Sequence, residues 1–170
     1  RLRARGALPM AVALRVMQEV SWAIAYAHAR GVIHRDIKPD NILLEEGNDR
    51  AVVTDFGIAA VGEGDTPVGT AVGTMHYMSP EQCRSAKDTV PASDQYALGV
   101  TLYEMIAGRV PFHGDGPAAI IMMHLNDEPS SPRNFRPNLP DTAEDVILKS
   151  LAKKPEDRYQ TVREILEEID

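Results

Sequence analysis

The stretches His34-Arg35-Asp36-Ile37-Lys38-Pro39-Asp40-Asn41 and Asp55-Phe56-Gly57 decide how this sequence folds and what kind of site it contains. They place three oxygen-bearing side chains in a fixed order: the carboxylate of Asp36, the amide of Asn41 and the carboxylate of Asp55. Carboxylate and amide oxygens are the ligands that hard divalent cations prefer. A lone aspartate would be a turn residue, but two such stretches in order, both flanked by apolar segments, indicate one shared site.

The segment between the two stretches has the pattern of a β-hairpin. Two short apolar runs, Ile42-Leu43-Leu44 and Ala51-Val52-Val53, are separated by the turn-forming residues Gly47-Asn48-Asp49. Strand pairing would place the residue before the first strand and the residues after the second at the same end of the hairpin. The pattern therefore predicts that Asn41 and Asp55 lie close together in space.

The rest of the sequence has a mostly helical pattern. Apolar residues at three- and four-residue spacing predict a helix from Pro9 that Gly31 ends: Ala13, Val16, Val20, Ile24 and Ala27. Ser93 is the candidate N-cap of a second helix, which Gly108 ends. Three further helices are indicated by Pro117 and by the capping-box spacings of Asp141 with Glu144 and of Thr161 with Glu164. We therefore expect a mainly α fold with one short β-hairpin.

The composition is that of an ordinary globular domain, with 44% hydrophobic and 25% charged residues. The 170 residues are enough for one hydrophobic core, so we expect one domain over residues 1–170. The net charge of -7 argues against nucleic acid as a partner. The single cysteine, Cys83, cannot form an internal disulfide, which favours a reducing, cytoplasmic location. No apolar run in the sequence is long enough to span a bilayer.

The two quoted stretches closely resemble the catalytic and magnesium-binding loops of the eukaryotic-type (Hanks-type) serine/threonine protein kinases, and their residues are most similar to bacterial members. The resemblance implies that Asp36 orients the substrate hydroxyl and accepts its proton. It implies that Lys38 neutralises charge on the transferred phosphoryl group of ATP. It also implies that Asn41 and Asp55 are ligands of Mg²⁺. The alternatives are a solvated loop lysine at Lys38 and simple turn caps at Asn41 and Asp55.

The segment Gly73-Thr74-Met75-His76-Tyr77-Met78-Ser79-Pro80-Glu81 resembles the substrate-docking end of a kinase activation segment, with Ser-Pro-Glu in place of the usual Ala-Pro-Glu. Within it, Thr74 matches a threonine that contacts the catalytic acid and lysine. Regulatory phosphorylation commonly falls where Thr70 lies, and Thr66 is a second candidate. Arg35 would hold the phosphothreonine by charge-assisted hydrogen bonds. The sequence supports about equally the alternative that Thr66 and Thr70 are simply polar residues of a glycine-rich loop.

Five further positions match residues that support the kinase fold rather than its chemistry. The resemblance implies that His34 packs under the site against Phe56 and orders the loop, instead of acting as an acid or base. Asp94 would hydrogen-bond the backbone of the loop that contains His34. Arg158 would form a partly buried ion pair with Glu81.

The resemblance covers essentially the whole chain but only the C-terminal lobe of the family. The thirty-three residues before His34 contain neither the glycine-rich phosphate loop nor the strand lysine of an N-terminal lobe. We therefore expect that lobe upstream, and little or no activity of these 170 residues alone. The implied function is transfer of the γ-phosphoryl group of Mg-ATP to serine or threonine hydroxyls of protein substrates in bacterial signalling, by a cytoplasmic kinase or the cytoplasmic part of a membrane-anchored one.

Three rival functions stay open. A pseudokinase or scaffold would use the same fold only for binding, although Asp36, Lys38 and both magnesium-ligand candidates are intact. A small-molecule kinase would share the acid and the asparagine but lack the docking segment and Arg158. These 170 residues alone would be an inactive interaction module if half of the nucleotide pocket lies elsewhere.

Overall fold

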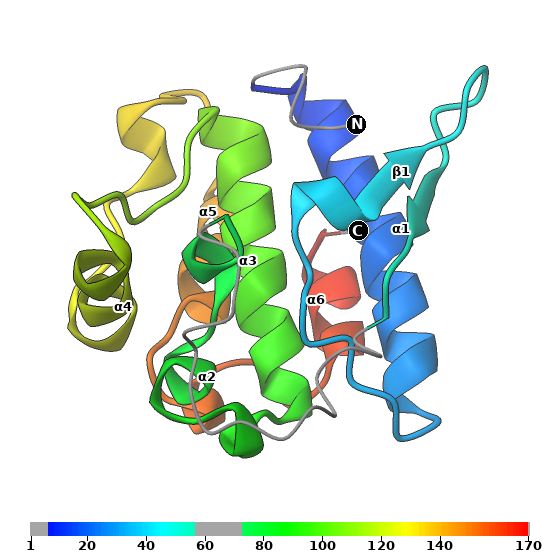
Figure 1. Ribbon diagram of the computed structural model, residues 1–170. Helices are drawn as coiled ribbons and strands as arrows, with labels where there is room; N and C mark the ends of the chain where they lie inside the picture. The colour runs from blue at the N-terminus through cyan, green and yellow to red at the C-terminus, as the bar shows by residue number, and fades with distance from the viewer. Residues whose placement is uncertain (1–6, 57–72, 170) are drawn as a thin grey trace.

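The computed structural model describes residues 7–56 and 73–169, so Gly57, Thr66 and Thr70 lie outside the described residues. The predicted mainly α fold with one β-hairpin is confirmed (Figure 1). No helix in these two ranges is long and apolar enough to cross a membrane. The elements in chain order are α1 (Met10–His28), β1 (Ile42–Leu44), β2 (Ala51–Val53), α2 (Pro80–Arg84), α3 (Pro91–Ala107), α4 (Pro117–Asn126), α5 (Asp141–Ser150) and α6 (Val162–Ile169).

α1 follows the predicted apolar stripe. Its first helical residue comes directly after Pro9, whose fixed φ suits a helix start. At its other end Gly31 has φ +74°, a conformation that costs glycine little, and the chain turns there towards the loop that begins at His34. The stripe faces the core, and all of its predicted residues are buried: Ala13, Val16, Val20, Ile24 and Ala27.

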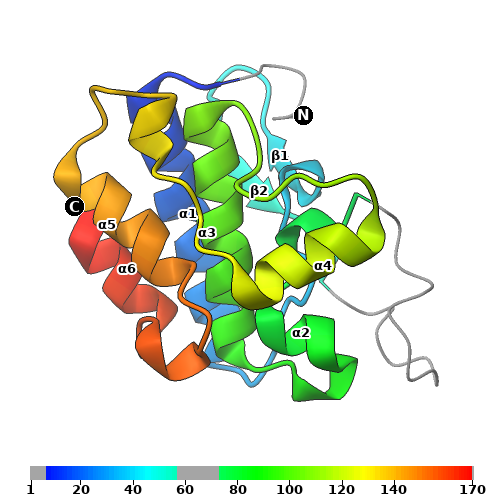
Figure 2. The same cartoon turned by 90° about the vertical axis from the view of Figure 1, so that its left-hand side faces the viewer.

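α3 is the centre of the molecule. It packs against α1 on one side and α5 on another, and α6 covers α1 (Figures 1 and 2). Its side chains are buried around most of its circumference, as expected for a helix enclosed by others. A Cβ built on Gly99 would lie 2.8 Å from Cβ of Ser150, so glycine allows α3 and α5 to approach this closely.

Two predicted helix starts are wrong in detail, although both helices exist. α3 begins at Pro91, because proline is favourable in a first turn, where its missing N–H is not needed. Ser93 therefore lies inside the first turn, where its hydroxyl accepts a hydrogen bond from Val90 N at 3.1 Å. α5 begins at Asp141, which is a helical residue and caps nothing. Gly108, with φ +74°, ends α3 as predicted.

The hairpin brings two distant parts of the sequence together, as predicted. β1 and β2 pair antiparallel, with Ile42 opposite Val53. The pairing continues past the strands, because Thr54 N donates to Asn41 O at 2.9 Å. Asn41 and the residues that follow β2, up to Asp55, therefore meet at one end of the hairpin.

α1 supports the far side of this hairpin. The Glu19 carboxylate accepts a hydrogen bond from Ala51 N, and the Arg15 guanidinium donates to Asn48 O at 3.2 Å. These bonds satisfy backbone groups at the edge and turn of a sheet that is too small to be stable alone. The hairpin is thus fixed to the helical core.

Candidate active site

The loop of residues 34–41, called the catalytic loop below, is held from beneath by α3. Asp94, 1% exposed, accepts hydrogen bonds from the backbone N–H groups of His34 and Arg35 at 2.9 and 2.8 Å. His28 Nε2 lies 2.7 Å from the same carboxylate. Charge-assisted bonds of this kind are about twice as strong as neutral ones, so Asp94 fixes the start of the catalytic loop.

His34 connects the two quoted stretches of sequence. It is fully buried, and its Nε2 lies 2.9 Å from Thr54 O on the strand side. Its ring packs against Phe56 with the centroids 4.6 Å apart, and Asp36 N donates to its Nδ1 at 3.3 Å. Both ring nitrogens are engaged by the protein, which leaves His34 in a supporting position beneath the loop.

Arg35 has a backbone conformation that is rare for its residue type. Its φ is +71°, and Asp55 has φ +58°. Non-glycine residues held in this region cost about 1–3 kcal/mol each, and they cluster at functional sites.

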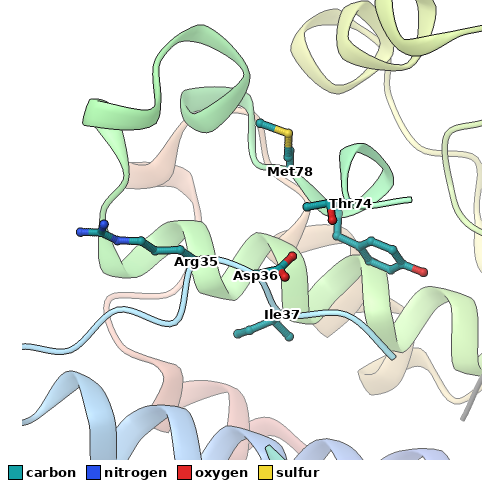
Figure 3. Close-up of a pocket in the computed structure, with 6 residues that line it drawn as sticks. Arg35, Asp36, Ile37, Thr74 and Met78 are labelled. Atoms are coloured by element: carbon teal, nitrogen blue, oxygen red, sulfur yellow. The ribbon is translucent and has the colours of Figure 1, made fainter. Parts of the chain in front are cut away.

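The exposed Arg35 side chain extends away from Asp36 (Figure 3). In the described ranges no hydrogen bond or ion pair engages its guanidinium. Its predicted phosphothreonine partners, Thr66 and Thr70, lie outside those ranges.

Asp36, Lys38 and Thr74 form the centre of the site. Lys38 Nζ donates to both carboxylate oxygens of Asp36, at 2.9 and 2.8 Å, and to Thr74 Oγ1 at 2.8 Å. One lysine therefore connects the catalytic loop with the segment of residues 73–81. Asp36 and Thr74 face a shallow hollow in the surface, while the Ile37 side chain points the opposite way (Figure 3).

Asn41 lies directly beside Asp36. Its Nδ2 donates to Asp36 O at 2.7 Å and to Asp36 Oδ2 at 3.1 Å. The amide nitrogen is therefore used within the catalytic loop, which turns the amide oxygen away from Asp36. Asn41 is buried in spite of its polarity, as expected when these bonds satisfy the nitrogen.

Asp55 follows β2 at the same end of the hairpin. It is exposed, and its Oδ2 lies 3.5 Å from Thr54 Oγ1, a weak contact. Thr54 also donates from its backbone to Asn41 O, so the chain just before Asp55 is tied to the catalytic loop. The structure thus places Asp55 at the same end of the hairpin as Asn41, and Asn41 lies beside Asp36.

The predicted ion pair between Glu81 and Arg158 is present and buried. Arg158 Nη1 and Nη2 donate to the two carboxylate oxygens at 2.8 and 2.9 Å. Ser93 Oγ donates to the same carboxylate at 2.7 Å. Burial by itself would raise the pKa of Glu81, but the hydrogen bonds and charge of Arg158, with the bond from Ser93, hold that pKa below its ordinary value. The pair fixes the end of residues 73–81 to the helical core.

Gln82 is one supporting residue to which the sequence interpretation assigned no role. It is buried on α2, and its Nε2 donates to Arg35 O at 3.0 Å. The signal was the spacing of Ser79 and Gln82, since a serine followed three residues later by glutamine is a capping box, and the structure contains that capping box. The contact with Arg35 itself has no sequence signal, because it joins residues forty-seven positions apart.

Comparisons with known proteins agree with this geometry. The protein kinase domain model matches residues 1–168. A probable serine/threonine-protein kinase of Clostridium perfringens is 41% identical over 172 residues, covering 99% of this chain and 25% of the relative. The serine/threonine-protein kinase PrkC of Bacillus subtilis is 42% identical over 171 residues, covering 99% of this chain and 26% of the relative. The chain thus spans about a quarter of the length of these relatives.

A solved structure has the same fold. The crystal structure of Rad53 1-466 in complex with AMP-PNP matches with a TM-score of 0.78 and 27% identity, over 97% of this chain and 41% of that chain. Together with the match of nearly the whole sequence to the domain model, this shows that the chain belongs to the protein kinase family, and that serine/threonine kinases of bacteria are among its relatives.

Proposed function

We propose that this chain is the C-terminal lobe of a serine/threonine protein kinase and that its catalytic loop transfers the γ-phosphoryl group of ATP to protein hydroxyls. Asp36 accepts the proton of the substrate hydroxyl as that oxygen bonds to the γ-phosphorus. The bond between the γ-phosphorus and the bridging oxygen breaks, and ADP leaves with the electron pair. A cytoplasmic location, where ATP is available, and the complementary lobe upstream belong to the same proposal.

The observation that carries this proposal is the position of Lys38. Its ammonium group bridges the Asp36 carboxylate and the Thr74 hydroxyl with three bonds of 2.8 to 2.9 Å. A cation held there faces the place where an acceptor hydroxyl would meet the phosphoryl group, so it can neutralise charge that develops during transfer. The neighbouring residues 73–81 provide the surface on which a protein substrate would lie. A kinase for small molecules has no need of that surface.

The residues present fit a magnesium ion shared with ATP. Asn41 uses its amide nitrogen in hydrogen bonds to Asp36 and so leaves its oxygen as the donor for a cation. Asp55 offers an exposed carboxylate at the same end of the hairpin. Mg²⁺ is usually bound by one or two such protein oxygens together with phosphates and water. When bound, the ion would neutralise charge on the phosphates, and Asn41 and Asp55 would orient them toward Asp36.

Regulation through Arg35 is a second part of the proposal. Its guanidinium is exposed and points away from the Asp36 carboxylate (Figure 3). A phosphate on Thr70 or Thr66 would give this guanidinium an anionic partner, held by charge-assisted hydrogen bonds.

The test is a phosphate-transfer assay with Asp36→Asn in the complete protein, including the lobe expected upstream. The variant keeps the size of the side chain but cannot accept the proton, so we expect kcat to fall about 10²- to 10⁴-fold. Binding of a fluorescent ATP analogue in the presence of Mg²⁺ should persist, because Asn41 and Asp55 are unchanged. A wild-type protein that binds the analogue without transferring phosphate would instead support the pseudokinase.

A further inference from the structure

The peptide unit between Arg35 and Asp36 is held at both of its polar ends. Its carbonyl, Arg35 O, accepts a hydrogen bond from Gln82 Nε2 at 3.0 Å. Its N–H, on Asp36, donates to His34 Nδ1 at 3.3 Å. Because a peptide unit is planar, fixing its carbonyl also fixes the direction in which the chain enters Asp36.

The Gln82 side chain has one orientation in which all of its contacts are favourable. Its Oε1 accepts from Ser79 N at 3.0 Å and from Ser79 Oγ at 3.1 Å, while its Nε2 faces Arg35 O. A rotated amide would put its NH₂ group against the Ser79 N–H and its oxygen against the Arg35 carbonyl. Gln82 is only 8% exposed, so water cannot readily replace these bonds.

Arg35 needs this support more than an ordinary loop residue does. Its φ of +71° is unfavourable for a side chain with a Cβ and persists only where the surroundings hold it. Asp94 holds the N–H of Arg35 at 2.8 Å, and Gln82 holds its carbonyl. Both sides of the strained residue before Asp36 are therefore fixed by buried side chains, one from α3 and one from α2.

We propose that Gln82 is a positioning residue for the catalytic acid, which connects the docking segment (residues 73–81) to the orientation of Asp36. Gln82 follows that segment directly and caps α2 together with Ser79, the last residue before the helix. A shift of the docking segment would therefore move the Gln82 amide, and with it the peptide unit that sets the Asp36 carboxylate. This role rests on the proposed kinase activity, but the hydrogen bond on which it depends can be tested without activity.

The sharpest variant is Gln82→Glu in the complete protein. A carboxylate of the same size can still accept both bonds from Ser79, but it presents an oxygen to the Arg35 carbonyl and can no longer donate. We expect kcat with myelin basic protein as acceptor to fall about tenfold, since misplacement of a reacting group is costly. The KM for ATP should change less than about twofold, because Gln82 contacts neither Asn41 nor Asp55. Gln82→Met, which removes the amide without adding charge, should give the same split between kcat and KM.

Hydrogen exchange read by mass spectrometry provides the readout that does not need activity. Amides in residues 34–38 should exchange about tenfold faster in both Gln82 variants, while those of α3 keep their protection. Arg84→Ala changes an exposed residue of the same short helix and should leave exchange and kcat unaltered.

The outcomes separate this proposal from the function on which it rests. Unchanged exchange in residues 34–38, or faster exchange with unchanged kcat, would overturn the positioning role. If the wild-type protein transfers no phosphate, the proposed function fails, and the exchange of Gln82→Met alone decides whether Gln82 holds the loop.

Discussion

Two regions of the site differ in the burial of their charged side chains. We call Glu81, Arg158 and Asp94 the buried supports, and Asp36 and Asp55 the exposed edge. In the supports, Glu81 is 5% and Arg158 is 3% exposed, and their charges meet each other. At the edge, the side chain of Asp36 is 33% exposed, and Asp55 lies open to solvent. The supports pair their charges in the interior, whereas the carboxylates at the edge stay accessible to solvent, that of Asp36 beside Lys38. Substitutions in the first region should therefore lower stability, and substitutions in the second should lower activity.

The largest loss of stability is expected for Arg158→Ala. The guanidinium donates to Glu81 and to three backbone carbonyls, so its removal leaves a buried carboxylate without its cation. Breaking a buried pair from one side costs about 3–5 kcal/mol. Urea unfolding measures this, with Arg133→Ala as the control, for which a smaller change is expected because Arg133 is partly exposed and pairs with the exposed Asp141 and with Glu144. Equal losses in the two variants would contradict the contrast between buried and exposed charges.

We expect the second largest effect for Asp94→Asn, which should lower the free energy of unfolding by about 2 kcal/mol, as expected for the loss of hydrogen bonds to a charged group. The amide keeps one oxygen but turns an NH₂ group toward donors from His34, Arg35 or His28. Thermal unfolding gives the size of the loss. Hydrogen exchange should show that it is accompanied by faster exchange in the catalytic loop. Protection of that loop at the wild-type level would show that Asp94 does not hold it.

The pH dependence of stability should report on Glu81. Because its folded-state pKa lies below its ordinary value of 4.5, the stabilisation is present above about pH 4.5 and is lost as the pH falls through the folded pKa. The free energy of unfolding should therefore decline more steeply in this acid range for the wild type than for Glu81→Gln. The matched variant Glu167→Gln, at an exposed position of α6, should keep the wild-type slope. Parallel slopes for all three proteins would contradict a charged, buried Glu81.

Asp36→Asn should change stability least, by less than about 1 kcal/mol, although the same variant is expected to remove nearly all activity. Its carboxylate is partly exposed, and the pair with Lys38 is accordingly worth little to folding. Differential scanning calorimetry beside the transfer assay measures both effects. A large loss of stability would place Asp36 among the buried supports and erase the distinction between the two regions.

The sequence predicted the parts of the fold that have local signals. The apolar stripe of α1, the hairpin between Asn41 and Asp55, and the glycine end of α3 depend on spacing and turn residues, which the sequence displays directly. The start of α3 was misplaced at Ser93, because a proline in the first turn and a good capping residue compete within three positions.

Some contacts between distant residues were anticipated from the resemblance to kinases, and others were not. The pairing of Glu81 with Arg158 and the bonds of Asp94 were anticipated only through the resemblance to kinases, since no pattern in one sequence reveals them. The bond from Gln82 to Arg35 and the contact of His28 with Asp94 were not anticipated at all. Each depends on how α1, α2 and α3 pack around the catalytic loop, and that arrangement is set by the whole core rather than by local sequence.

The most direct test of this account is a crystal structure of the complete protein with Mg²⁺ and a non-hydrolysable ATP analogue. The buried supports hold the catalytic loop in place, and we expect Asn41 and Asp55 to bind one nucleotide-bound cation beside Asp36. We expect an ion about 2.1 Å from both the Asn41 amide oxygen and the Asp55 carboxylate, with the γ-phosphate facing Asp36. An ion bound without either side chain, or Asn41 and Asp55 on separate surfaces, would contradict it.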